Sequence, residues 1–168
     1  MKKILVIGSL NVDFSISVDK IPLPGETINA DKLLISNGGK GANQAYTIGK
    51  LGGDVSMLGL VGDDIYGQNL KESLTKTNVD VNGIYTSSEG ETGKAFIYVD
   101  KNGENCISII HGTNYLVNSD FIIKHEQLIK DADIILIQLE IPMEAIKTIL
   151  EIAKDKIILL DPAPATKE

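Results

Sequence analysis

The sequence predicts an α/β fold, in which a main layer of parallel strands and helices is joined by a small β flap. Short aliphatic runs alternate with helical patterns from about residue 41 onward, as in a parallel sheet with crossover helices. Residues 14–18 alternate strictly between apolar and polar, as a strand with one covered face does. Residues 95–99 and 105–110 flank an Asn-Gly pair, which is a strong hairpin signal.

Four strands are expected in the main layer. Each is an aliphatic run of strand length, and the last one is halted by the Asp-Pro pair at residues 161–162. The expected strands are residues 3–7, 55–60, 134–138 and 156–160.

Four helices are expected around these strands. Asp63 or Asp64 can cap the second helix, and Ser119 or Asp120 opens the third, because such side chains accept hydrogen bonds from the first helical turn. Pro142 suits the start of the fourth. The expected helices are residues 41–50, a helix containing Tyr66, Leu70 and Leu74, residues 119 to about 130, and a helix after Pro142 with Ile146, Ile149, Leu150 and Ala153 on its apolar face.

Composition excludes several classes of function. The chain has 168 residues and a net charge of −7, and this negative charge argues against a nucleic-acid partner. No stretch approaches 18 consecutive apolar residues, so a membrane partner is not expected. All 16 basic residues are lysines, which leaves no arginine to clamp a phosphate. The single cysteine, Cys106, favours a reducing, cytoplasmic setting.

A glycine-rich segment, residues 38–43 (GGKGAN), precedes the first expected helix. Glycines at the mouth of a helix let a ligand approach the backbone and leave free N–H groups facing it. The segment is not a P-loop, because Gly41 follows Lys40 where that motif needs serine or threonine. The alternative is a flexible turn before the helix.

Polar side chains also follow two of the expected strands. Asn11 and Asp13 come shortly after the first strand and point the same way if the segment is extended. A carboxylate and an amide are suited to the hydroxyls of a polyol, although Asn and Asp are also common turn formers. Glu140 follows the strand at 134–138 and needs a partner or a ligand there. Its alternative is a carboxylate in the first turn of a helix.

Together these segments resemble the ribokinase (phosphofructokinase-B type) family of sugar kinases. The resemblance extends over essentially the whole chain. It is carried by residues 8–13 (GSLNVD), 24–27 (PGET), 38–45 (GGKGANQA) and 138–140 (QLE).

The resemblance implies a three-layer α/β/α main domain with a β-sheet lid, and an enzyme that makes ribose 5-phosphate from ribose and MgATP. The main domain would comprise residues 1–13, 37–90 and 112–168, and the lid residues 14–36 and 91–111. Two lids would clasp each other in a homodimer. By motif match, the ribose-binding residues would be Asn11, Asp13, Gly39, Lys40, Gly41, Asn43 and Glu140.

The resemblance also implies that the C-terminal half of the fold is absent from this chain. That half would supply the catalytic base, the nucleotide pocket and the loop that binds a monovalent cation, K+. The 168-residue chain alone is therefore expected to bind no metal or cofactor and to be inactive. Two alternatives stay open: a kinase of another small sugar, such as fructose or a sugar acid, and a non-catalytic fragment that binds sugar or dimerises.

Overall fold

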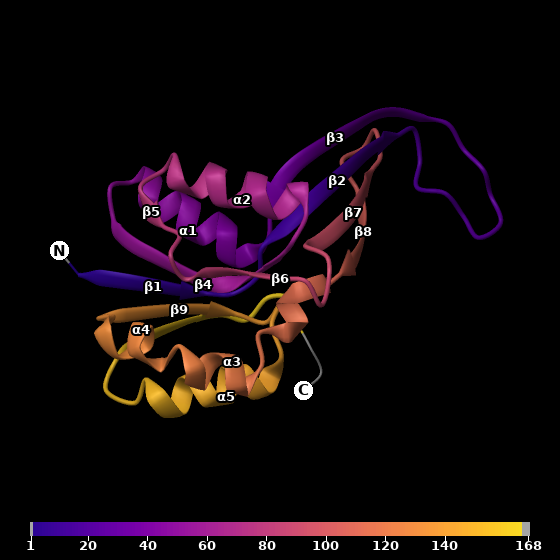
Figure 1. Ribbon diagram of the computed structural model, residues 1–168. Coiled ribbons are helices and arrows are strands. Elements are labelled where there is room, and N and C mark those ends of the chain that lie inside the picture. The colour runs from indigo at the N-terminus through magenta and orange to yellow at the C-terminus, as the bar shows by residue number, and fades with distance from the viewer. Residues whose placement is uncertain (1, 166–168) are drawn as a thin grey trace.

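The computed structural model describes residues 2–165 and contains two sheets (Figure 1). The main sheet has the strand order β10-β9-β1-β4-β5, with β6 paired to β4. Every pairing in it is parallel. Its strands are β1 (Lys3–Ile7), β4 (Asp54–Gly62), β5 (Val79–Asp80), β6 (Ile84–Ser87), β9 (Ile134–Gln138) and β10 (Ile157–Asp161).

Helices cover both faces of the main sheet, so the expected α/β class is confirmed (Figure 1). Leu5 and Ile7 of β1 belong to one core and Val6 to the other. Burial on both faces explains why these strands are almost continuously aliphatic. None of the helices in residues 2–165 is both long and apolar enough to cross a membrane. One face carries α1 (Lys40–Lys50) and α2 (Ile65–Thr75), and the other carries α3 (Ser119–Lys124), α4 (Glu126–Asp131) and α5 (Met143–Ile152).

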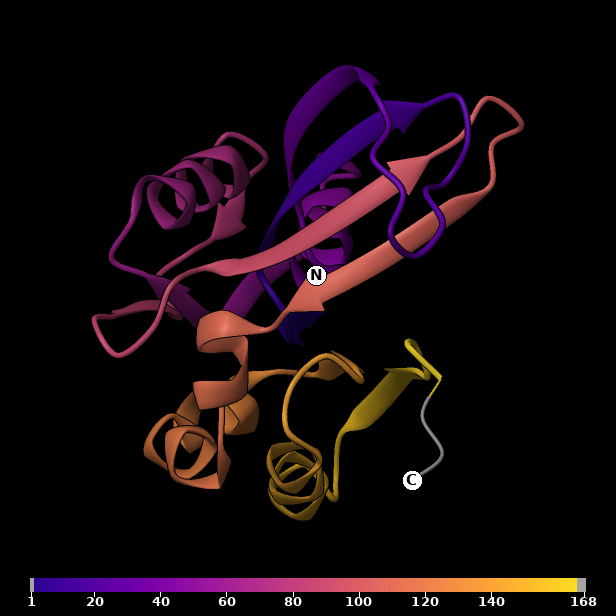
Figure 2. The same cartoon turned by 90° about the vertical axis from the view of Figure 1, so that its right-hand side faces the viewer.

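A second, four-stranded sheet stands away from the main layer, and we call it the lid sheet (Figure 2). Its order is β3-β2-β7-β8, with β2 parallel to β7 and antiparallel to β3. The expected hairpin joins β7 to β8 and turns at Gly103, whose φ is 85°. The four strands are β2 (Asn11–Val18), β3 (Ala30–Gly38), β7 (Gly93–Val99) and β8 (Asn105–Ile110).

Strands β2 and β3 run across the predicted domain boundaries at residues 13–14 and 36–37. Both strands pair only within the lid sheet, which therefore includes residues 11–13 and 37–38. After β8 the chain returns to the main layer through a short 3-10 helix, η1 (Gly112–Leu116).

The structure corrects three expectations about local structure. The helix expected at residues 119–130 is two helices that meet at His125, whose ring stacks on Tyr85 with centroids 4.1 Å apart. Neither Ser119 nor Asp120 caps α3, because the Asn118 side chain accepts the hydrogen bond from Phe121 N. Leu150 is exposed, whereas its expected companions Ile146, Ile149 and Ala153 are buried.

Asp64 caps α2 and ties it to the start of β7. Its Oδ1 accepts from Gly67 N at 2.9 Å and from Thr92 Oγ1 at 2.7 Å, and its Oδ2 accepts from Thr92 N at 2.8 Å. Burial of the carboxylate opposes ionisation, but the hydrogen bonds from Thr92 and Gly67 outweigh it and lower the pKa of Asp64. Asp64 therefore holds the main layer and the lid sheet together at their junction.

Replacing Asp64 with alanine is expected to lower the free energy of unfolding by about 1–2 kcal/mol, the usual cost of losing a helix cap. Because the folded-state pKa is lowered, the ionised carboxylate stabilises the fold above the ordinary aspartate pKa. This stabilisation is lost as the pH falls through the lower, folded-state value. Urea unfolding at several pH values measures both effects. Asp63→Ala is the control, because the neighbouring Asp63 is exposed and does not cap the helix; an equal loss in both variants would contradict the assignment.

Candidate functional site

A small cavity lies where β1 and β9 end, between the N-terminus of α1 and the lid sheet. Its volume is about 130 Å³. Sites for drug-sized ligands usually measure roughly 300–1,000 Å³, so this cavity suits a small ligand. It is lined by Asn11, Asp13, Gly39, Lys40, Asn43, Ala95, Ile97, Ile107, Ile109 and Glu140.

Six of the seven residues expected to bind a ligand line this cavity. The exception is Gly41, the second residue of α1, where a Cβ atom would come within 2.8 Å of the backbone carbon of Gly8. Gly41 lets the helix pack closely on the segment after β1. Its expected role in contacting a ligand remains a prediction.

Glu140 is buried at the bottom of the site and has partners from two segments. Its Oε2 accepts a hydrogen bond from the Ser9 hydroxyl and another from Lys40 N at 3.2 Å. Lys40 Nζ lies 3.6 Å from Oε1. The sequence predicted that this buried charge needs a partner, and the structure supplies one at the N-terminus of α1. Ser9 was not singled out from the sequence, although it lies within the GSLNVD segment.

Asp13 extends from β2 toward the same cavity. Its carboxylate packs directly on Gly38, since a Cβ atom there would lie 2.2 Å from Oδ2. Burial raises the pKa of Asp13, and the nearby negative charge of Glu140 raises it further, while Lys40 lowers it. The site thus holds two acidic groups and one lysine in a small volume, and Asp13 ionises less readily there than an aspartate in water.

The backbone N–H groups of the first four residues of α1 donate hydrogen bonds within the protein. Lys40 N donates to Glu140, Gly41 N to Ser9 Oγ at 3.5 Å, and Ala42 N to Ser9 O at 3.0 Å. Asn43 N donates to Gly39 O at 2.9 Å. The amides of residues 40–43 are therefore not free to face a ligand, contrary to what was expected for this part of the glycine-rich segment.

Gly39 allows a close backbone contact, but with the segment after β1, so the expected approach of a ligand to this glycine remains a prediction. Its φ of 90° lies in the left-handed region, and a Cβ atom would come within 2.7 Å of Ser9 O and 2.8 Å of Asn11 N. Glycine at this position lets the α1 N-terminus and the start of β2 approach each other, so that their side chains reach one cavity.

Apolar side chains of the lid sheet cover the cavity on its other side. Ala95 and Ile97 of β7 and Ile107 and Ile109 of β8 line it. Register pairs Ala95 with Ile109 and Ile97 with Ile107, so the four residues share one face. Sequence reasoning missed these residues as part of a site, although the hairpin that carries them was predicted.

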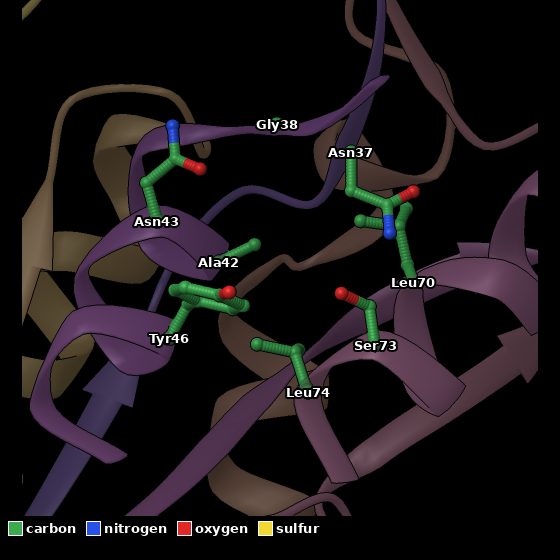
Figure 3. Close-up of a pocket in the computed structure, with 8 residues that line it drawn as sticks. All are labelled: Asn37, Gly38, Ala42, Asn43, Tyr46, Leu70, Ser73 and Leu74. Carbon is green, nitrogen blue, oxygen red and sulfur yellow. The ribbon is translucent and has the colours of Figure 1, made fainter. Parts of the chain in front are cut away.

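A second, larger hollow of about 300 Å³ lies between α1, α2 and the end of β3 (Figure 3). Tyr46 from α1 and Ser73 and Leu74 from α2 point toward one another across it (Figure 3). Its lining is neutral, whereas the acidic groups and Lys40 converge on the smaller cavity. We therefore identify the smaller cavity as the candidate site.

Comparison with known proteins identifies the family. The family model described as pfkB family carbohydrate kinase matches residues 1–168. The chain belongs to this family. It is 40% identical over 173 residues to the ribokinase of Schizosaccharomyces pombe, covering 98% of this chain and 54% of that protein.

Solved structures agree with this assignment. The ribokinase of Thermotoga maritima has a TM-score of 0.88 and 38% identity, over 99% of this chain and 55% of that chain. The ribokinase of Arabidopsis thaliana, solved with ribose and ATP, has a TM-score of 0.80 and 28% identity, over 96% of this chain and 54% of that chain. The chain thus spans about half the length of the relatives it matches.

Carbohydrate kinases of the pfkB family also use ATP, but the residues around this cavity do not fit a triphosphate. The first-turn amides of α1 are bonded to Ser9, Gly39 and Glu140. The one lysine in the lining, Lys40, faces Glu140, and the chain has no arginine. The cavity therefore presents a net negative charge, which suits hydroxyl groups and not phosphate.

Replacing Asp13 with asparagine is expected to stabilise the fold slightly at neutral pH, by under about 1 kcal/mol because solvent screens a half-buried charge. A carboxyl group with a raised folded-state pKa destabilises the fold once the pH rises through that value. Below the ordinary aspartate pKa both states are protonated, so the difference between variant and native chain should vanish. Thermal unfolding across this pH range measures the difference. A variant less stable at neutral pH would show that the carboxylate supports the fold.

Proposed function

We propose that this chain is the ribose-binding N-terminal part of an ATP-dependent kinase that converts D-ribose into ribose 5-phosphate. The convergence of Asp13, Lys40 and Glu140 on one small cavity carries this proposal. Carboxylates accept hydrogen bonds from neighbouring hydroxyls, and the lysine donates. Kinship with the ribokinases of S. pombe and T. maritima supports ribose as the sugar.

The proposal divides the chemistry between two parts of the whole enzyme. Residues of this chain would bind and orient the sugar, which lowers the barrier to transfer by fixing the geometry of the acceptor hydroxyl. The catalytic base, the MgATP site and the monovalent-cation loop would belong to the rest of the enzyme. The whole enzyme would be a cytoplasmic homodimer joined through the lid.

The isolated chain is expected to bind ribose but not to phosphorylate it, because the nucleotide site would belong to the rest of the enzyme. Calorimetric titration with ribose, fructose and gluconate in the absence of ATP tests binding and ranks the sugars. Incubation with ribose and MgATP, followed by detection of sugar phosphate, tests turnover. No binding of any sugar would refute the proposed site, and tighter binding of fructose or gluconate would change the substrate. Turnover that persists after removal of host kinases would show that the base lies within this chain.

A further inference from the structure

Asn114 is a buried amide at the base of the candidate site. Asn114 lies in η1, which returns the chain from β8 to the main layer, and only 1% of the residue is exposed. Its Oδ1 accepts a hydrogen bond from Leu10 N at 2.9 Å, and its Nδ2 donates to Leu10 O at 3.2 Å. The same Nδ2 donates to Asn11 Oδ1 at 2.7 Å. Asn114 does not line the cavity but touches a residue that does.

The two backbone bonds fix which way the Asn114 amide faces. A backbone N–H can only donate and a carbonyl can only accept, so Leu10 allows one orientation of the side-chain amide. Asn114 can then offer only an N–H to Asn11. Asn11 must therefore accept this hydrogen bond through its Oδ1. The NH₂ group of Asn11 is then free to face the cavity that Asn11 lines. The orientation set by Leu10 is thus transmitted through Asn114 to Asn11.

Gly93, the first residue of β7, makes this contact sterically feasible. A Cβ atom at residue 93 would lie 2.1 Å from Asn11 Oδ1 and 2.3 Å from Asn114 Nδ2. A side chain at this position would separate the two amides. Three elements, β2, β7 and η1, therefore meet around a single side-chain hydrogen bond.

We propose that Asn114 is a positioning residue that fixes Asn11 as a hydrogen-bond donor to the sugar. This inference rests on the proposed function. Asn11 and Asp13 lie two residues apart on β2 and face the same side. Asn11 therefore donates to a sugar oxygen while ionised Asp13 accepts from a sugar hydroxyl. Such a donor–acceptor pair is matched by hydroxyl groups, which can do both.

The first test uses the unmodified chain, labelled with nitrogen-15, and needs no ligand. We expect the NH₂ protons of Asn114 to exchange with solvent more slowly than those of Asn11, because both protons of Asn114 are bonded inside the protein. On addition of ribose, the NH₂ resonances of Asn11 should shift and those of Asn114 should stay close to their free positions. Protected Asn11 protons in the free chain would overturn the proposed orientation.

The second test uses variants at residue 114. Asn114→Ala should raise the Kd for ribose about tenfold, since the Asn11 amide is no longer held in one orientation. Asn114→Asp should weaken binding at least as much, because it presents oxygen where Asn11 needs a donor.

Thr113→Val is the matched control. Thr113 is fully buried in the same 3-10 turn and donates to Leu60 O at 3.1 Å, with no hydrogen bond to Asn11. The Thr113→Val substitution should lower the melting temperature and leave the Kd for ribose unchanged. An unchanged Kd in Asn114→Ala, or an equal rise in Thr113→Val, would reduce Asn114 to a structural residue. Absence of ribose binding by the unmodified chain would refute the proposed function, whereas the exchange rates would still decide the amide orientation.

Discussion

Asp13→Ala is expected to raise the Kd of the chain for ribose by roughly 10- to 100-fold. Asp13 lines the cavity and is an acceptor-only group when ionised. Its removal leaves sugar hydroxyls without a partner, which costs about 1–3 kcal/mol per unpaired group. A tenfold change in Kd corresponds to ~1.4 kcal/mol. Titration calorimetry at neutral pH measures this change directly.

The pH dependence of ribose binding separates the charge of Asp13 from its shape. Burial and the charge of Glu140 raise the pKa of Asp13, so native binding should weaken as acid protonates it above the ordinary aspartate pKa. Asp13→Asn should bind weakly at every pH and lack this step. Ser15→Ala, at the next position on the same face of β2, is the control for general damage to the strand. Native affinity in Asp13→Ala would reduce Asp13 to a local structural role.

The elements that were predicted well are those whose burial follows a simple rule. Residues 134–138 form β9 with the expected bounds because a strand covered on both faces is aliphatic throughout. Strand β3 (Ala30–Gly38) was missed, since it lies at the edge of the lid sheet and most of its side chains are exposed. Its sequence therefore has no alternation to detect. The break at His125 was also missed, because it depends on stacking against Tyr85, which is 40 residues away in sequence.

The candidate site was predicted more completely than the contacts that support it. Asn11, Asp13 and Glu140 follow strands whose ends must meet at one edge of a parallel sheet, and the structure brings them together. Asn114 gave no such signal. It looks like an ordinary turn former, and its role depends on hydrogen bonds to Leu10 and Asn11, which are more than 100 residues away. Motif spacing alone does not reveal contacts of this range.

The lid sheet has apolar side chains on both faces, which favours association between two chains. The face opposite the cavity carries Ile16, next to Leu33 on β3 and Tyr98 on β7. Leu33 is 56% exposed, and on the cavity side Ile107 is 51% exposed. A thin sheet cannot bury both faces within one chain, and such surfaces commonly mark interfaces. We therefore expect the chain to form a discrete dimer through the lid sheet.

Ile16→Asp is expected to convert that dimer into monomers, because a buried, unpaired charge would face the partner lid. Light scattering across a concentration series measures the change, and thermal unfolding confirms that the variant is folded. Ile107→Asp places the same charge on the opposite face; if it alone dissociates the dimer, the interface lies on the cavity side. Leu159→Lys addresses a competing surface, since Leu159 of β10 is 52% exposed and could drive nonspecific aggregation. A native chain that stays monomeric at high concentration, or aggregates that respond only to Leu159→Lys, would rule out association through the lid.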